Sequence, residues 1–453
     1  MKVRNSVVTI KNAYSKMNGK KYELLMLLLI LSSHIFFLKT TYKPYIFPDS
    51  SSYMHPQWKM FFGILPKFWT FGRTPVYPVF IAVVRFLFGE EKYLLAVVGI
   101  QEAFCFVSLF FLFRTLKMIT SNRRVISLIT LAYGCSPAVL SWNYCILTES
   151  LALSMCVIYV FLMCKFIKTK SDTVGMTVFI CVLIMTFERP SFLLFLPVTV
   201  AFLLFFSLIG KHKKLLKTYL TALCSVVVVT GYSFGFYKVN GIFSISNPVP
   251  RQLLYVVMQR GYYKNSPNLE FRNIVEKSWD GTIESIWPSV GKVLGYYGLA
   301  ESQKLAFESI KNSKYQYIRD EIRLSFDVCA SPWNGYYINK DFPHSLAGNI
   351  KRALRILYIN FFTILLHVIP AHTLLVAGFS LFVAIKQLFL RRINWLLFGC
   401  GCYVFLIFSS SMILTNAEYM RTMIHLLPLF YLNIVCLFDS LCNKGNKFYV
   451  QEF

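Results

Sequence analysis

A small set of charged side chains lies in short turns between long apolar runs, where chemistry at a membrane surface could take place. Charges close to membrane depth are costly and are usually kept for function. A carboxylate there can accept a proton from an attacking hydroxyl, and an arginine can hold a phosphate through paired hydrogen bonds. The pattern favours a substrate with a lipid tail in the bilayer and a phosphate at its surface. The set comprises Asp49 in "FPDSSSYM", Glu149 in "ILTESLAL", Glu188 and Arg189 in "TFERPSF", and Glu418 and Arg421 in "NAEYMRTM".

Each of these residues also has a structural explanation, which the sequence leaves open. Asp49 is a good N-cap for a helix that begins at "SSSYM". Glu149 suits the first turn of a helix, where the macrodipole favours an acid. Glu188 could simply pair with Arg189.

Structural explanations also exist for the pair Glu418 and Arg421 and for Glu102. Glu418 and Arg421 could form a structural salt bridge with each other. Glu102, in "GIQEAF", is the exception to the pattern, because it falls in the middle of a predicted membrane span. We expect its carboxylate to be satisfied inside the helical bundle.

The composition indicates a membrane protein that holds these residues on helices. Of 453 residues, 56% are hydrophobic, 17% aromatic and only 15% charged, and apolar runs of about 18 residues or more are typical of membrane helices. We predict an all-α polytopic protein with ten or eleven spans, the eleventh depending on whether Leu354–Ile369 crosses or lies flat. The first run lacks a cleavage site and is expected to stay as an anchor. The ten predicted spans are Tyr22–Lys39, Lys92–Phe113, Val125–Trp142, Ser150–Phe166, Val174–Phe187, Phe192–Ile209, Leu215–Tyr237, His372–Leu390, Asn394–Leu414 and Thr422–Leu441.

The net charge of +26 comes from basic residues that are concentrated in particular segments between the predicted spans. Met1–Lys21 carries six basic residues and no acid, and the inter-span segments Arg114–Arg124 and Lys211–Lys217 carry four basic residues each and no acid. The positive-inside rule places such loops in the cytoplasm. We therefore predict a multi-pass protein of the inner (cytoplasmic) membrane with a cytoplasmic N-terminus, and with the charged turns on the periplasmic or outer face. Nucleic acid is not an expected partner, because no folded basic face is visible.

This topology divides the chain into four parts. Residues 1–21 form a cytoplasmic tail, and 22–238 form a transmembrane core whose first outer loop, 41–91, contains an interfacial helix at Val76–Gly89. Residues 239–350 form a polar outer segment of 112 residues, expected to be a small mixed domain or an elaborated loop. Residues 351–453 return the chain to the membrane surface and supply the last spans.

Several stretches resemble the GT-C superfamily of glycosyltransferases, in particular its members related to dolichyl-phosphate-mannose protein mannosyltransferases and to the lipid A aminoarabinose transferase. They are "FPDSSSYM", "GRTPVYPVFIAVVRFLFG", "SPAVLSWNYCILTESLAL", "FERPSFLLFLPV" and "EYMRTMIHLLPLFYL". The resemblance covers roughly Tyr22–Trp142 and shorter signatures later, but not Val239–Ile350.

The resemblance implies an enzyme that passes a sugar from a polyprenyl phosphate to a protein, lipid or glycan acceptor outside the cytoplasm. It maps the catalytic carboxylate onto Asp49, which acts as general base in an inverting displacement. The second acid that many members carry in this loop is replaced here by serines, so Glu149 is the candidate for that role.

Under this interpretation the remaining charged and polar residues serve the donor phosphate or support the site. Candidates for phosphate binding are Arg421, Arg189 and Arg73, in that order, although Arg73 would also serve as an interfacial anchor. Glu418, Tyr53 and Glu188 are expected to support them. No cofactor or metal ligand set is indicated, and a divalent cation stays an open alternative.

Two other functions compete with this one. An oligosaccharide polymerase or ligase would use a lipid-diphosphate donor and commonly carries a large outer loop late in the chain. A flippase or transporter for lipid-linked glycans would instead place ionisable groups at membrane depth, where Glu102 is the one candidate.

Overall fold

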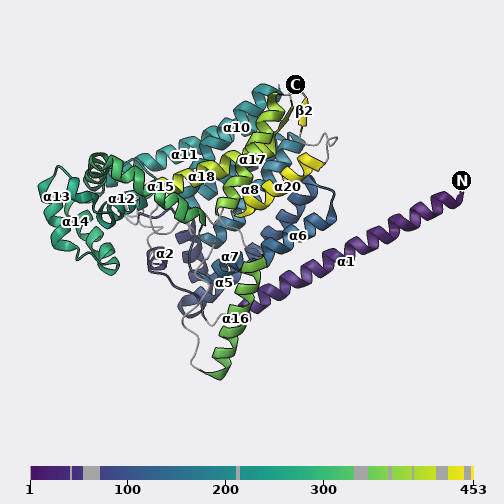
Figure 1. Cartoon of the computed structure of the whole chain (residues 1–453), viewed down its shortest axis with the longest axis horizontal. Coiled ribbons are helices and arrows are strands. Elements are labelled where there is room, and N and C mark those ends of the chain that lie inside the picture. Colours follow the sequence, from purple (N-terminus) through teal and green to yellow (C-terminus); the bar gives the residue numbers. More distant parts are fainter. Residues whose placement is uncertain are drawn as a thin grey trace.

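The fold is a bundle of long apolar helices with a group of polar helices at one end (Figure 1). The structure is a computed structural model that describes residues 2–40, 43–54, 72–210, 215–330, 345–365, 370–389, 392–414, 427–442 and 450–452. The helices of the first half are α1 (Lys2–Thr40), α2 (Ser50–Met54), α5 (Val76–Ile119), α6 (Arg123–Gly134), α7 (Pro137–Leu140), η1 (Ser141–Tyr144), α8 (Glu149–Thr169), α9 (Asp172–Glu188), η2 (Pro190–Leu194), α10 (Phe195–Gly210) and α11 (Leu216–Asn240).

The second half begins with the polar helices and returns to the bundle. Its only sheet within the described residues is a short antiparallel pair in which Arg392 faces Glu452. The elements are α12 (Pro248–Gln259), η3 (Tyr262–Asn265), α13 (Leu269–Ser278), α14 (Ile283–Asn312), α15 (Lys314–Ala330), α16 (Leu346–Leu365), α17 (Pro370–Phe389), β1 (Arg392–Asn394), α18 (Trp395–Leu414), α20 (Leu427–Cys442) and β2 (Val450–Glu452).

The prediction of an all-α polytopic membrane protein is confirmed. In the described part of the chain, five helices are long and apolar enough to span a membrane: the last 20 residues of α1, α5, α8, η2 with α10, and α11. The count becomes six if α6 and the α7–η1 pair form one span, and shorter apolar helices occur within α17, α18 and α20. The larger number of ten or eleven spans stays a prediction.

Apolar side chains on the outside of the bundle support a lipid environment. On α1, Leu24, Leu28, Leu31, Ile35 and Leu38 are all exposed, which a helix in water would avoid over such a length. By contrast, α8 is the most buried of the five candidate spans and packs against α5 and α9. It therefore forms the centre of the bundle.

The predicted span Val125–Trp142 is not one straight helix. α6 ends at Gly134, and α7 and η1 leave at an angle of 44°. Pro137 is the physical reason, because a proline lacks the amide that the preceding turn would need and disfavours helical backbone in the residue before it. Ser136 accordingly adopts an extended conformation, with ψ at 123°.

The short apolar run Val76–Gly89 and the following span are both helical, and they are separated by a break. Within α5, Gly89 has φ 75° and ψ 170°, a conformation open to glycine because it has no Cβ. Phe86, Leu87 and Phe88, just before the break, are exposed over half or more of their surface. This pattern fits the predicted interfacial helix.

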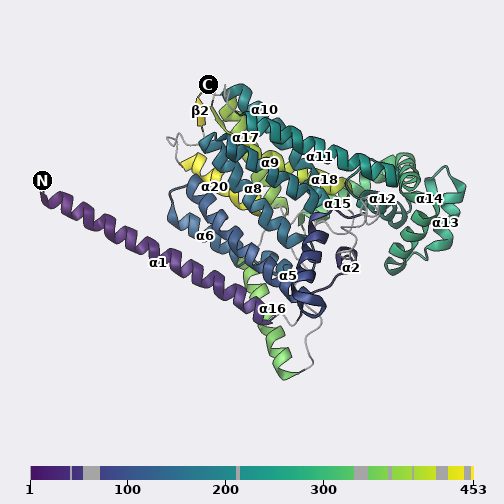
Figure 2. The same ribbon diagram turned by 180° about the vertical axis from the view of Figure 1, so that it is seen from behind.

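The 112-residue polar segment, expected to be a mixed domain or a loop, consists mainly of helices joined by short connections in its described part. Helices α12, α13 and α14 enclose a small apolar core of their own, which includes Leu254, Val257, Phe271 and Val290. Figures 1 and 2 show this group at one end of the bundle, next to α2, while the C-terminal strand β2 lies at the opposite end. We call the end of the bundle that carries this helical group and α2 the α2 end.

Helix α16 lies across the last turns of α1. The Tyr358 hydroxyl donates to the Cys135 carbonyl at 2.9 Å, and the Arg355 guanidinium lies 4.8 Å from the Phe37 ring centre. Its other face exposes Leu346, Ile350, Leu354, Leu357 and Phe361. A helix with one apolar exposed face and one packed face suits the membrane interface.

Candidate functional site

The first loop brings Asp49 and Arg73 together at the α2 end. The Arg73 Nη2 donates to the Asp49 Oδ1 at 3.1 Å, Nε donates to the Ser52 Oγ at 2.9 Å, and Nη1 donates to the Tyr53 hydroxyl at 3.2 Å. The guanidinium also lies 4.6 Å from the centre of the Tyr53 ring. The Asp49 side chain is 41% exposed, so that a substrate can reach the carboxylate. We call Asp49, Ser52, Tyr53 and Arg73 the loop cluster.

Arg251 joins the loop cluster from the polar segment. It lies on α12, within electrostatic range of both Asp49 and Arg73. Desolvation and then the charge of Arg73 lower the pKa of Arg251 from its usual value, while the Asp49 carboxylate acts in the opposite direction. The cluster therefore combines one accessible carboxylate with two arginines.

The turn that carries Arg73 is fixed by contacts with two distant segments. The Asn247 amide donates to the Gly72 carbonyl at 3.1 Å, and the Thr74 hydroxyl donates to the Glu188 carbonyl at 3.1 Å. Gly72 has φ +67°, and a Cβ at this position would lie 1.9 Å from the Asn247 side-chain nitrogen. Glycine is required at Gly72 for both reasons.

The chain before Asp49 is fixed against the segment before α8. The Tyr45 amide donates to the Tyr144 carbonyl at 2.8 Å, and the Ile146 amide donates to the Tyr45 carbonyl at 3.0 Å. The Phe47 ring stacks on Trp142, with their centres 6.2 Å apart. Because α8 starts at Glu149, this bridge sets the position of Asp49 relative to the next acid in the predicted site.

Glu149 and Arg189 form a buried ion pair. The Arg189 Nη1 lies 3.1 Å from the Glu149 Oε1 and 3.3 Å from the Thr148 hydroxyl, and the Glu149 side chain is fully buried. In a region of low dielectric constant such a pair holds together strongly, because separating it would leave a buried charge without compensation. Arg189 is also within electrostatic range of Glu188, but its hydrogen-bonded partners are Glu149 and Thr148.

Glu188 is buried beside this pair. Its residue is 1% exposed, and neither carboxylate oxygen has a hydrogen-bond partner among the described residues. Arg189 is extended, with φ −146° and ψ 129°, and Pro190 begins the next helix. The chain therefore turns away from α9 directly after Glu188, and the Arg189 side chain reaches Glu149 instead.

A polar network continues from these acids into the bundle. The Tyr77 hydroxyl donates to the Gln101 side-chain oxygen at 2.8 Å, and the Gln101 amide group donates to the carbonyls of Asn143 and Cys145 at 2.9 and 3.0 Å. Tyr77 lies within electrostatic range of Glu149 and also packs edge-to-face on Tyr53. It thus links the buried acids to the loop cluster.

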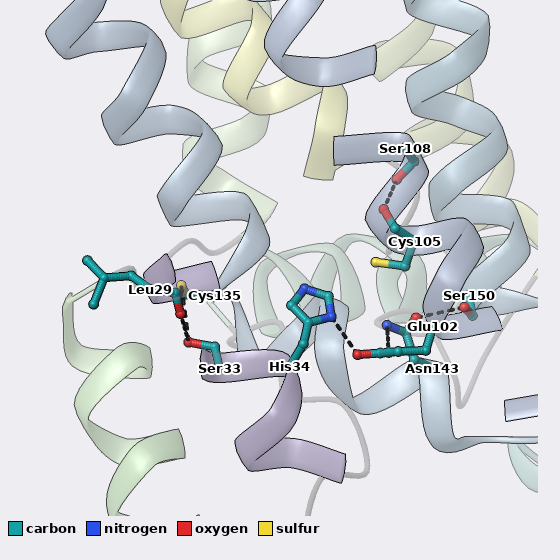
Figure 3. Close-up of polar contacts among 9 residues, drawn as sticks. All are labelled: Leu29, Ser33, His34, Glu102, Cys105, Ser108, Cys135, Asn143 and Ser150. Carbon is teal, nitrogen blue, oxygen red and sulfur yellow. Dashed lines mark hydrogen bonds and ion pairs between the residues drawn. The ribbon is translucent and has the colours of Figure 1, made fainter. Parts of the chain in front are cut away.

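Glu102 is satisfied inside the bundle, as predicted (Figure 3). One of its oxygens lies 2.5 Å from the His34 Nδ1, and the other accepts from the Asn143 side chain at 2.6 Å. Asn143 in turn accepts from the Ser150 hydroxyl at 2.7 Å. The structure therefore adds His34, on α1, as the ionisable partner of Glu102.

The predicted site residues thus fall into two neighbouring groups. Asp49, Tyr53 and Arg73 meet in the loop cluster, and Glu149, Glu188 and Arg189 lie together in the protein interior. Glu418 and Arg421 lie outside the described residues. Sequence reasoning missed Arg251, which follows the turn "NPVP" in a segment where the family signatures are absent.

Comparisons with known proteins give distant structural similarity alone. No family model matches the chain, and no curated protein matches it. Among solved structures, the archaeal oligosaccharyltransferase AglB from Archaeoglobus fulgidus, in complex with an inhibitory peptide and a dolichol-phosphate, aligns with a TM-score of 0.43 and 10% sequence identity. The alignment covers 94% of this chain and 52% of that one, so this chain spans about half the length of that protein.

Proposed function

We propose that the protein is a membrane glycosyltransferase of the GT-C type. It moves a sugar from a polyprenyl-phosphate donor to an acceptor on the non-cytoplasmic face of the membrane, and the reaction inverts the anomeric centre. The observation that carries the proposal is the loop cluster, in which an accessible carboxylate, Asp49, lies 3.1 Å from the guanidinium of Arg73. Arg251 adds a second cation within electrostatic range of both residues.

In this mechanism Asp49 takes the proton of the acceptor hydroxyl as that oxygen attacks the anomeric carbon. The bond from the anomeric carbon to the donor phosphate oxygen breaks, and the lipid phosphate leaves with the negative charge. General base catalysis of this kind typically contributes about 10²–10⁴-fold in rate. Cationic donors aimed at the leaving phosphate stabilise the charge that develops there.

The pairing of Asp49 with Arg73 supports an order of events. A nearby guanidinium favours the ionised carboxylate and so weakens it as a base. A donor phosphate competes for the same guanidinium, because arginine binds phosphate through paired, charge-assisted hydrogen bonds. Donor binding therefore draws Arg73 from Asp49 and raises the basicity of the carboxylate when the acceptor is to be activated.

The buried group has a supporting role in the proposal. Arg189 is held by Glu149 and Thr148, so Arg73 and Arg251 are better placed than Arg189 to contact a phosphate at the surface. In the proposal Glu149 is still the second acid of the site, and Glu188 supports it. Arg421 and Glu418 remain proposed contributors to the phosphate site, and no metal ion is assigned.

One observation favours a second candidate function, a transporter or flippase for lipid-linked glycans. His34 and Glu102 form an ionisable pair within the membrane-spanning parts of α1 and α5, and such pairs occur on ion and substrate pathways. Under this alternative the His34–Glu102 pair, and not Asp49, would be essential.

The test uses the purified full chain in detergent with a polyprenyl-phosphate sugar, and measures the release of lipid phosphate. We expect Asp49→Asn to reduce turnover by about 10²–10⁴-fold, and Arg73→Lys to raise the KM for the donor more than it lowers kcat, since lysine cannot reproduce the arginine fork. Asp280→Asn, an equal change at an exposed carboxylate in the connection between α13 and α14, should leave turnover unchanged.

The transporter alternative predicts the opposite result in vesicles. Movement of lipid-linked substrate across the bilayer would survive Asp49→Asn and disappear in Glu102→Gln. Sugar transfer that continues at the native rate in Asp49→Asn would refute the proposed mechanism.

A further inference from the structure

A narrow apolar cavity lies between α1 and α6, away from the loop cluster. Its volume is about 350 Å³, and most of its wall consists of aliphatic side chains. Leu25 and Leu29 come from α1, and Leu128 and Leu131 from α6. The cavity opens toward the lipid-facing side of the bundle, where Leu25, Leu29 and Leu128 are largely exposed.

Two adjacent arginines line the same cavity. Arg123 and Arg124 occupy the first turn of α6, and both are exposed. Neither forms an ion pair with any residue that the structure describes. Their two positive charges are therefore available to an anion at the end of an apolar groove.

The other charged groups nearby do not cancel this charge. On α1, the acid Glu23 is paired with Lys117 of α5 at 3.1 Å, and Lys21 adds a further positive charge. On α5, Arg114 lies 5.1 Å from the Phe110 ring centre. The net charge of the side chains around the cavity is therefore positive.

The local backbone indicates which groups would hold an anion. Asn122 caps α6, and its side chain accepts from the amides of Arg124 and Val125. These amides are thus already satisfied within the protein. An anion at this point would be held by the two guanidinium groups, with the dipole of α6 as a secondary contribution.

We propose that this cavity binds an anionic phospholipid. The lipid phosphate lies against Arg123 and Arg124, and one acyl chain occupies the groove between α1 and α6. The combination of a basic mouth and an apolar wall matches a charged head joined to a hydrocarbon tail, which basic pockets between membrane helices are known to hold. The predicted topology places this lipid in the cytoplasmic leaflet, on the opposite side of the membrane from the loop cluster.

The test measures lipid binding to the full chain in detergent by native mass spectrometry. The probes are phosphatidylglycerol, phosphatidylcholine and the water-soluble glycerol 3-phosphate, each at equal concentration. We expect phosphatidylglycerol to bind at least tenfold more tightly than phosphatidylcholine. Arg123→Gln combined with Arg124→Gln should weaken phosphatidylglycerol binding by about thirtyfold, the factor expected from two basic residues near a charged surface.

Two further variants separate the groove from general surface charge. Lys165→Gln combined with Lys168→Gln removes two exposed cations from the end of α8, and should change the preference by less than twofold. Ser127→Phe fills the groove and should weaken both lipids without changing the binding of glycerol 3-phosphate.

Three results would overturn the proposal. Equal binding of the two lipids would exclude a role for charge, and an equal loss in the control variant would indicate a non-specific attraction. Binding of glycerol 3-phosphate as tight as that of phosphatidylglycerol would show an anion site that makes no use of the groove.

Discussion

Replacement of Gly72 by alanine tests how the turn positions Arg73. The new Cβ would carry two separate costs. The backbone at φ +67° is unfavourable for any residue with a side chain, and the Cβ would also collide with Asn247, whose nearest atoms lie at 1.9–2.3 Å. Left-handed backbone costs about 1–2 kcal/mol, and overpacking typically costs about 1–3 kcal/mol. The expected loss of stability is therefore about 2–5 kcal/mol.

Two further variants separate these costs. Gly261 has a similar φ of +73° in left-handed backbone, with ψ 13°, and nothing lies within 4 Å of its ideal Cβ. Gly261→Ala should therefore cost only the backbone share, about 1–2 kcal/mol. In Gly72→Ala with Asn247→Ala, the colliding side-chain atoms are gone while the hydrogen bond from the Asn247 amide to the Gly72 carbonyl can still form. The double variant should therefore return close to the value for Gly261→Ala.

The assay is equilibrium unfolding of the full chain in mixed detergent micelles, followed for all four variants, Asn247→Ala alone included. The same proteins are assayed for sugar transfer, since displacement of the turn moves Arg73 from Asp49. If Gly72→Ala costs no more than Gly261→Ala, or if adding Asn247→Ala to it gives no recovery, the turn is not held by close packing and this reasoning is wrong.

Two other predictions concern ionised groups. Glu149→Gln should destabilise the protein by about 3–5 kcal/mol because it leaves the Arg189 charge uncompensated in the interior, and adding Arg189→Gln should restore part of the loss; a strictly additive double-mutant cycle would contradict this. Hydrogen bonds from Ser285 and then Thr282 lower the pKa of Asp280 to about 2, so its stabilising contribution should be complete above about pH 4 and lost as the pH falls toward 2. Thermal unfolding of native protein and Asp280→Asn across this range should show curves that converge at the acid end, and a constant difference between them would refute the assignment.

The membrane helices follow directly from the sequence because each is encoded locally. A run of about 18 apolar residues has few stable alternatives in a bilayer, and where the structure describes the predicted spans they accordingly fall largely on helices. The bend after α6 was missed, although Pro137 marks it, since the hydropathy of Val125–Trp142 is continuous across the break.

Most residues of the candidate site could be predicted one by one, but the contacts between them could not. Asp49 and Arg73 each follow from their motifs, yet their contact depends on a turn fixed by Asn247. The position of Arg189 opposite Glu149 depends on the chain direction after Glu188. Arg251 carries no local signal at all, because it reaches the loop cluster from a separately packed group of helices.

The histidine partner of Glu102 could have been found. A carboxylate within a bundle needs a donor or an opposite charge, and His34 lies near the middle of the first apolar run. Its contact with Glu102 links α1 to α5, and an electrostatic argument would have offered His34 as one of three histidines in the ten predicted spans, beside His372 and His425.

Two contacts that position the loop cluster can form only after their later partners have been synthesised: that of Tyr45 with the segment before α8, and that of Gly72 with Asn247. About 100 residues separate the partners of the first contact and about 175 those of the second. At about 5–20 residues per second, Arg73 waits roughly 9–35 s after leaving the ribosome for the residue that fixes its turn. The first loop is therefore synthesised well before the residues that fix it. During this interval the loop cluster is still incomplete while the insertion machinery and its chaperones handle the chain.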